Sequence, residues 1–224
     1  MSTVSRYGRS DLRRSRALCA IARACVVALL PALAMSEVQA AAECEPFKWM
    51  PERLDFNAAK DQRRVRSIES FHFDADAESL IRGKTGLLGA DIDFLVRYVP
   101  NHHRGLAALV RLALRDKTPQ PSGVSISVEC YLLRALEFKR SDVEVQKLYA
   151  TYLARLGRND EALVWFEQVE KLAPDDAVVA YNMGLVLTEK GEYERARAYA
   201  KRAYAGGLDF PGLRDKLTRQ GEWR

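Results

Sequence analysis

Apolar residues recur at helical spacing along the second half of the chain, and their pattern repeats. When residues 143–176 are laid over residues 177–210, an offset of 34 residues aligns bulky, small and turn positions in both halves of the segment. The aligned pairs are Tyr149 with Met183, Ala150 with Gly184, Leu153 with Leu187, Gly157 with Gly191, Ala162 with Ala196, and Val169 with Ala203. The pattern predicts two copies of one helix-turn-helix unit.

Each aligned position has a physical role in such a unit. The first helix presents an apolar face formed by Tyr149, Ala150 and Leu153, with the small residue where the partner helix comes close. Gly157 ends that helix, because a left-handed backbone carries no side-chain penalty at glycine. The second helix has an opposing face at four- and three-residue spacing: Ala162, Phe166 and Val169. Pro174 cannot continue this helix and marks the turn into the next unit.

This order of small, aromatic, Gly, Ala and Pro positions resembles the tetratricopeptide repeat. The resemblance implies one repeat at residues 143–176 and another at residues 177–210. The second departs mildly from the pattern, since Ala200 replaces an expected bulky residue and Leu208 stands where proline is usual, with Pro211 shortly after.

A degenerate first repeat is predicted within residues 89–142. Pro100 fits the repeat-ending proline, Asn101 is a good helix N-cap, and the first helix has an inner face of Leu106, Leu109 and Ala113. A second helix is expected from about Ser125 to Phe138, after the proline-rich loop DKTPQPSG, which lengthens this repeat by about six residues. The ten residues before Pro100 would close a preceding half-repeat.

The two ends of the predicted array carry no repeat signature. Within the N-terminal extension at residues 41–88, RVRSIESFHF alternates enough to predict a short edge strand, and DADAESLIRG predicts an acidic-capped helical turn ending at Gly83. Residues 211–224 predict a capping helix over the last repeat, with Leu213, Leu217 and Trp223 turned inward. The fold class is therefore predicted as all-α: a tetratricopeptide-repeat helical hairpin solenoid with a short irregular N-terminal extension and a C-terminal capping helix.

Residues 1–40 have the composition of a cleavable signal peptide. Five arginines precede an apolar run of twelve residues from Ala24 to Met35, which is too short to cross a bilayer. The small-x-small sequence VQA then predicts cleavage before Ala41, with cleavage after Ala42 nearly as suitable. These features predict a periplasmic protein.

Two other routes stay open for this segment. If Arg23 is ignored, the apolar stretch extends back to Ala17, and a retained inner-membrane anchor facing the periplasm becomes possible. Arg13 and Arg14 raise the twin-arginine route, but the residues after them do not complete that signal. General secretion is the preferred prediction.

Removal of the leader changes the charge of the chain. The leader carries six arginines against Asp11 and Glu37, so cleavage takes 35 basic and 30 acidic side chains to 29 and 28. The pI near 9.0 therefore reflects the leader. Little net field remains to attract nucleic acid, and no nucleic-acid partner is expected.

Cysteine usage agrees with export. Cys19 and Cys25 leave with the leader, and the even pair Cys44 and Cys130 suggests a disulfide in an oxidising compartment. On the chain-entropy model such a bond contributes roughly 4 kcal/mol, less any strain. The alternative is two unpaired thiols.

The sequence supports none of three kinds of catalytic or metal site. The segment RGKTG at residues 82–86 lacks the first glycine of a phosphate-binding loop, because Glu78 stands there. His102 and His103 are adjacent in a predicted helix, so they point about 100° apart and cannot easily share a metal ion, and His72 is the only other histidine. Neither a G-x-S-x-G elbow nor an activated cysteine is evident. We therefore expect no enzyme activity, no metal and no cofactor.

The first helix of each stacked pair lines the concave side of such an array, where a partner peptide or helix usually binds. The predicted groove residues are Arg104, Arg111, Lys147, Thr151, Arg155, Tyr181, Asn182 and Leu185, with Ala108, Leu148 and Glu189 beside them. Arg111, Lys147 and Asn182 could hold an acidic segment or a C-terminal carboxylate by charge-assisted bonds. The fit to the carboxylate clamp of some tetratricopeptide proteins is partial, since Leu148 stands where that clamp has Asn. Ordinary solvated side chains are the alternative.

The layout of an extension, the helix start PNHHR, two clear repeats and the tail PGLRDKL resembles a group of secreted proteobacterial repeat proteins. That resemblance implies no established activity. The predicted function is a periplasmic scaffold or adaptor that binds an unidentified partner protein for an envelope assembly or secretion system. The alternative is a structural subunit that uses the repeats for self-association or for packing into a larger envelope complex. Membrane contact is expected only if the leader is retained.

Overall fold

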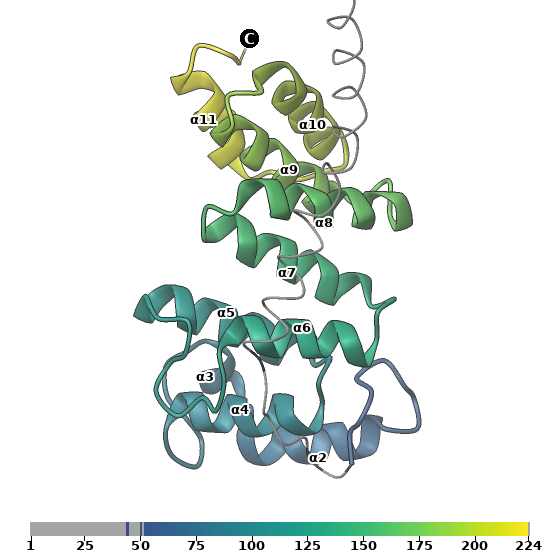
Figure 1. The fold of residues 1–224 in the computed structure, drawn as a ribbon, viewed down its shortest axis with the longest axis vertical. Coiled ribbons are helices and arrows are strands. Elements are labelled where there is room, and N and C mark those ends of the chain that lie inside the picture. The colour runs from purple at the N-terminus through teal and green to yellow at the C-terminus, as the bar shows by residue number, and fades with distance from the viewer. Residues whose placement is uncertain (1–43, 45–49, 51, 224) are drawn as a thin grey trace, which may run out of the picture. The chain divides into compact units, whose positions relative to one another are not determined.

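The computed structural model describes Cys44, Met50 and residues 52–223, and the expected signal peptide at residues 1–40 lies outside them. Within the described residues all regular structure is helical (Figure 1). The helices are α2 Gln62–His72, α3 Ala75–Glu78, α4 Leu88–Tyr98, α5 His103–Asp116, α6 Val128–Phe138, α7 Val143–Arg155, α8 Asn159–Leu172, α9 Ala177–Glu189, α10 Tyr193–Ala205 and α11 Pro211–Arg219. None of them is long and apolar enough to cross a membrane.

The last helices pack as hairpins in chain order, which confirms the predicted helical solenoid. α7 packs on α8, α8 on α9 and α9 on α10 (Figure 1). The hairpin turns need a left-handed residue, and they have one: φ is +77° at Gly157 and +75° at Gly191. A residue with a side chain would be strained at either position.

Small residues at the helix contacts let the hairpins close. Ala162, Ala196 and Ala200 are completely buried. At Gly184 a Cβ atom would lie 2.5 Å from Cδ2 of Leu213, so the missing side chain makes room for α11. Leu213 and Leu217 of α11 are fully buried, and Trp223 packs against the same core. The last repeat therefore has its apolar surface covered.

The first unit differs from its prediction at the start of α5. His102, not Asn101, is the N-cap, because its side chain accepts a hydrogen bond from the Gly105 amide. Asn101 is buried in a polar network with Asp55 and Asp142. The prediction of Asn101 as the cap is wrong, because a long-range network took its side chain.

The loop before α6 is also tied by polar contacts. The Ser125 amide and hydroxyl bond to the carboxylate of Asp93 on α4, at 2.7 and 2.9 Å. Ser127 then caps α6 by accepting from the Cys130 amide at 3.2 Å. The helix consequently begins at Val128, three residues later than predicted.

The predicted edge strand over RVRSIESFHF is wrong, because this segment forms most of α2. A single strand would have left its backbone groups without a partner strand, whereas a helix satisfies them internally. The same letters place Val65 and Ile68 three residues apart on one helical face, and α2 packs that face on α4. The extension is therefore more regular than predicted. The acidic-capped turn is present as α3, where the Asp74 carboxylate accepts from the Ala77 amide.

Candidate functional site

A cleft of about 470 Å³ lies along the inner helices α5, α7 and α9, with α3 at one end. It follows the N-terminal part of each inner helix, and every lining residue on α5, α7 and α9 comes before the last turn. Its walls mix charged groups with an apolar floor. The first helices of three successive pairs thus contribute to one surface, as the repeat pattern predicts.

Five of the eight predicted groove residues meet in this cleft: Arg104, Arg111, Lys147, Thr151 and Asn182. Leu148, named beside them, also lines it. The other three lie elsewhere. Arg155 ends α7, and Leu185 packs against the core in the second half of α9. Tyr181 makes an edge-to-face contact with Phe210, just before α11, with 5.8 Å between the ring centroids.

Several residues that line the cleft were not predicted from the sequence. Ala108 was expected in the groove but is completely buried, and Ala107 lines the cleft instead. The remaining missed residues are Glu78, His103, Glu144, Phe166, Val178 and Val179. Most follow from the helical register once the cleft is known to lie near the N-terminal ends of the inner helices. Glu78 is different, because it comes from the extension, which no repeat template covers.

Arg104 and Glu78 form a charge pair at one end of the cleft. Arg104 Nε donates to Glu78 Oε1 at 2.8 Å, and its Nη2 donates to Oε2, so the pair is bidentate. Arg104 Nη1 also reaches Glu69 Oε1 at 3.4 Å. The hydrogen bond from Arg104 holds the pKa of Glu78 below its usual range. Glu78 is therefore ionised at neutral pH and faces the cleft.

Two further arginines of α5 hold the same segment by its backbone. Arg111 Nη2 donates to the Glu78 carbonyl at 2.7 Å, and Arg115 Nη1 donates to the Leu80 carbonyl at 2.9 Å. Among the described residues, Arg111 has no carboxylate within ion-pair distance. Arg111 thus holds this segment by a carbonyl oxygen, and its charge also helps to lower the pKa of the nearby Glu78 carboxyl group.

Lys147 bridges two inner helices in the middle of the cleft. Its Nζ lies 2.7 Å from Glu144 on α7 and 2.8 Å from Asp176, which caps α9 by accepting from the Val178 and Val179 amides. Burial alone would lower the pKa of Lys147, but the hydrogen bonds to Asp176 and Glu144 outweigh it and raise the pKa. Lys147 therefore stays charged while its charge is balanced within the protein.

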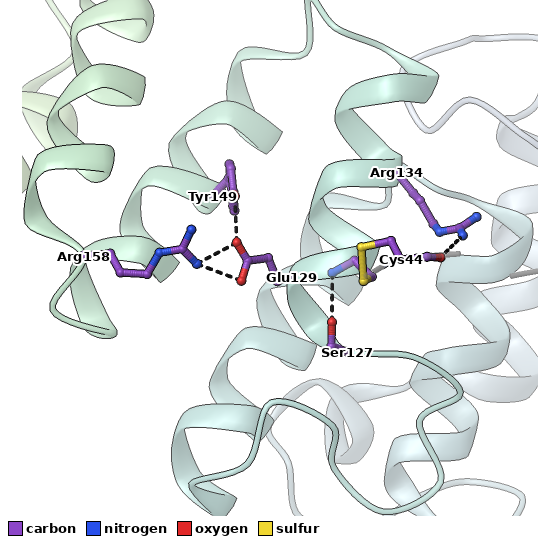
Figure 2. Close-up of a disulfide and its surroundings, with 7 residues drawn as sticks. Cys44, Ser127, Glu129, Arg134, Tyr149 and Arg158 are labelled. Carbon is purple, nitrogen blue, oxygen red and sulfur yellow. Dashed lines mark hydrogen bonds and ion pairs between the residues drawn. A yellow bond between two sulfur atoms is a disulfide. The ribbon is translucent and has the colours of Figure 1, made fainter. Parts of the chain in front are cut away.

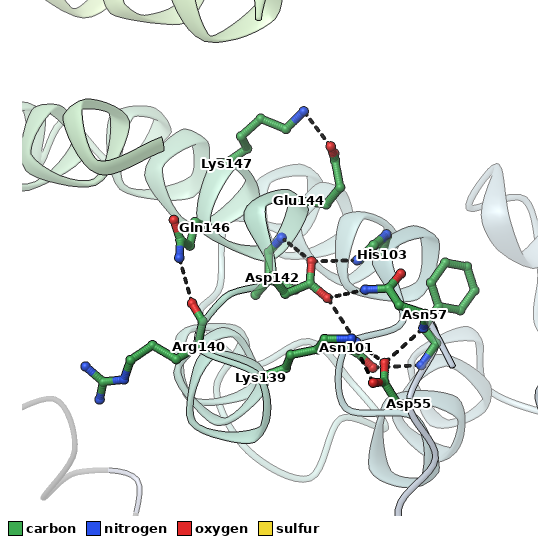
Figure 3. Close-up of polar contacts among 12 residues, drawn as sticks. Asp55, Asn57, Asn101, His103, Lys139, Arg140, Asp142, Glu144, Gln146 and Lys147 are labelled. Carbon is green, nitrogen blue, oxygen red and sulfur yellow. Dashed lines mark hydrogen bonds and ion pairs between the residues drawn. The ribbon is translucent and has the colours of Figure 1, made fainter. Parts of the chain in front are cut away.

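A buried carboxylate, Asp142, is bonded to the cleft residue His103. Asp142 accepts from Asn101 Nδ2 at 2.9 Å and from Asn57 Nδ2 at 2.8 Å, and its other oxygen lies 2.8 Å from His103 Nε2 (Figure 3). Burial would raise the pKa of Asp142, but these bonds from His103 and Asn101 lower it. Asp142 also caps α7 through the Val145 amide. One carboxylate thus joins the extension, α5 and α7.

Each of the three histidines is hydrogen-bonded to a carboxylate. His72 pairs with Asp91 at 2.8 Å, His102 with Glu69 at 3.0 Å, and His103 with Asp142. In the part of the chain that is described, no group of three or more His, Cys, Asp or Glu side chains could hold a metal ion. The histidines tie helices together there.

The RGKTG segment wraps around one internal carboxylate. The Lys84 and Thr85 amides donate to Asp91 Oδ2 at 2.6 and 2.8 Å, and the Thr85 hydroxyl donates to Oδ1 at 2.5 Å. The amides that would cradle a phosphate in a nucleotide-binding loop already have a partner. The segment is a turn between α3 and α4.

The predicted disulfide is present in the structure. Cys44 is bonded to Cys130 at the start of α6, across 86 positions of sequence (Figure 2). Arg134, one turn further along α6, donates from Nη2 to the Cys44 carbonyl at 2.6 Å. On the same helix, the Glu129 carboxylate accepts a hydrogen bond from the Tyr149 hydroxyl at 2.8 Å. It also accepts two from Arg158 Nη1, at 2.7 and 2.8 Å. α6 therefore connects the extension to the first strong repeat.

Comparison with known families identifies one repeat. Residues 177–205, which contain α9 and α10, match the family model described as tetratricopeptide repeat. No curated protein matches the chain. The predicted repeat in this segment is confirmed, and its combination with the all-helical fold indicates a protein-protein interaction scaffold. Repeats of this family are generally non-catalytic.

Proposed function

We propose that the chain is a periplasmic scaffold or adaptor that holds an extended segment or a helix of another protein in the cleft. The observation that carries the proposal is the cleft itself, which crosses α5, α7 and α9 and so offers successive layers of contact to one bound segment. Ala107, Leu148 and Val178 supply apolar contacts between the charged groups. This mixture suits a peptide better than a small molecule.

The same cleft favours a partner segment that carries a carboxylate. Arg111, Lys147 and Asn182 line it together, and charge-assisted bonds from a cation and an amide to one carboxylate are strong. Lys147 is already paired with Glu144 and Asp176, whereas Arg111 is bonded to a backbone carbonyl. A carboxylate of the partner should therefore bind to Arg111. A side-chain carboxylate and a C-terminal carboxylate both meet this requirement.

Two features of the chain support the periplasm as its compartment. The leader composition and the Cys44–Cys130 bond both suit an oxidising periplasm. A retained anchor would leave the cleft in the same compartment. We further propose that the partner belongs to an envelope assembly or secretion system, because such systems need adaptors that bind segments outside the cytoplasm.

The test is site-specific photo-crosslinking in cells. A photoreactive residue at Asn182, inside the cleft, should crosslink to a partner protein, whereas one at Lys201, exposed on α10 and outside the cleft, should not. Arg111→Glu combined with Lys147→Glu should reduce the yield at Asn182 about tenfold or more, because two charge contacts are reversed. Circular dichroism would check that the variants stay folded.

Two results would contradict the proposal. An unchanged yield in the charge-reversed variant would show that the cleft does not bind the partner. Crosslinks only between copies of this chain, with a stable oligomer in sedimentation, would favour the structural-subunit alternative.

A further inference from the structure

The acidic end of the cleft is built from the extension and not from the repeats. α3 lies against α5, and three arginines of α5 bond to α3 or to the residues just after it. Arg104 bonds to the Glu78 carboxylate, Arg111 to the Glu78 carbonyl and Arg115 to the Leu80 carbonyl. Phe73 and Ala77 anchor the segment, since both are buried. A bound peptide segment would meet the same arginines.

Among the described residues, the ion pairs of the cleft leave one cation, Arg111, without a carboxylate within ion-pair distance. Arg104 is matched by Glu78 and Glu69, and Lys147 by Glu144 and Asp176. Arg111 remains, with Asn182 and Thr151 as neutral polar neighbours on the lining. The Thr151 hydroxyl donates to the Lys147 carbonyl, which leaves its oxygen as an acceptor. The surrounding contacts come from Ala107, Leu148 and Val178.

We propose that Glu78 is the specificity-determining residue of the cleft: by occupying Arg104, it selects a partner segment with a single carboxylate among aliphatic side chains and rejects an acidic tract. This inference rests on the proposed function of the cleft. A second carboxylate near Arg104 would face the ionised Glu78. It would also find the guanidinium bonded on all three nitrogens, two of them to Glu78 and the third to Glu69. Like charges that approach without a counterion are unfavourable, whereas one carboxylate at Arg111 gains a charge-assisted bond.

The experiment compares two short labelled peptides of alanine and valine, one with a single central glutamate and one with three glutamates. Fluorescence anisotropy gives the Kd of each for the full mature chain. The wild type should prefer the single-glutamate peptide. Glu78→Gln keeps the size of the side chain and removes the bidentate carboxylate partner of Arg104, which leaves only the longer contact to Glu69. It should therefore tighten binding of the three-glutamate peptide about fivefold and change the single-glutamate peptide less.

Matched variants separate the local effect from net charge. Glu194→Gln makes the same charge change on exposed α10, outside the cleft, and should leave both affinities unchanged. Adding Arg104→Gln to Glu78→Gln should abolish the gain, because the freed cation is then gone. Arg104→Gln alone should weaken both peptides, since it leaves Glu78 unpaired. Thermal unfolding of each variant would check the fold.

The outcomes distinguish this inference from the function on which it rests. If Glu78→Gln binds both peptides as the wild type does, or if Glu194→Gln gives the same gain, Glu78 does not set specificity. The same conclusion holds if neither peptide binds any variant. In each case a charge-sensitive crosslink at Asn182 would still support the cleft as the partner site, and its loss would refute the function separately.

Discussion

The two halves of the described chain are held together by different kinds of contact. From α7 to α10 the buried residues are almost all apolar, and bulky side chains such as Phe166 share one core with alanines. Before residue 143 the interior also contains polar groups. Of the eight buried polar residues among those described, six lie in this part: Asp91, Asp93, Asn101, His102, Arg134 and Asp142.

The distances in sequence differ in the same way. The hairpins α7–α8 and α9–α10 close through neighbours in the chain, as expected for stacked repeats. The extension reaches its place through distant partners, including Asn57 to Asp142, Lys139 to Asp55, and Cys44 to Cys130. The extension contributes few residues to the buried apolar core, so specific polar bonds and a covalent link help to fix its position.

The two halves should therefore be destabilised by different kinds of substitution. In the repeats, a cavity should be most damaging, because packing is the main source of stability. In the extension, breaking the covalent link or changing the charge of a buried group should matter most. Three measurements test this division, from the largest expected effect to the smallest.

The largest effect is expected for Phe166→Ala in α8. The Phe166 ring is fully buried, so its removal should lower the free energy of unfolding by about 3–5 kcal/mol in urea titration. Phe210→Ala is the matched control, because that ring is 56% exposed and should cost less than about 1 kcal/mol. Equal losses for the two variants would show that packing does not dominate in the repeats.

The second effect concerns the disulfide. Replacing both cysteines, as Cys44→Ser with Cys130→Ser, should lower the free energy of unfolding by about 2–4 kcal/mol, because the unfolded chain loses a long closed loop. Hydrogen exchange should rise mainly in α4 and α6, with α9 and α10 much less affected. Reduction of the wild type should reproduce this pattern. Uniform loss of protection across all helices would contradict the division between the two halves.

The sequence was sufficient to predict the repeats because their rules are local. Gly157 and Gly191 end first helices, and alanines mark helix contacts, so the register of α7 to α10 followed from one offset. The sequence was insufficient where contacts with residues distant in the chain determine the position of a side chain. Asn101 has the composition of an N-cap, but Phe56, Asp55 and Asp142 take its side chain.

The cleft, too, could be predicted from the sequence only in part. Helical register placed Arg111, Lys147 and Asn182 on one surface, as predicted. It did not say where along the inner helices the cleft lies, and so Arg155 and Leu185 were included and Val178 was missed. Glu78 could not be found from the repeat pattern, because its position depends on how the extension packs on α5. The only local signal was the acidic cap of its short helix.

The smallest effect is a pH dependence that only the N-terminal half should carry, because His72, His102 and His103 are the three histidines of the chain. Burial lowers the pKa of His102 from 6.5 to about 4, so the native imidazole stays neutral while the unfolded one takes a proton. Stability should be complete above pH 6.5 and fall by up to about 3 kcal/mol toward pH 4. His102→Asn keeps a capping side chain without a titrating ring, and should flatten this slope between pH 6.5 and 4.5. If the variant and the wild type lose the same free energy of unfolding over that interval, the buried histidine is not the source, and the pH dependence belongs to carboxylates spread over both halves.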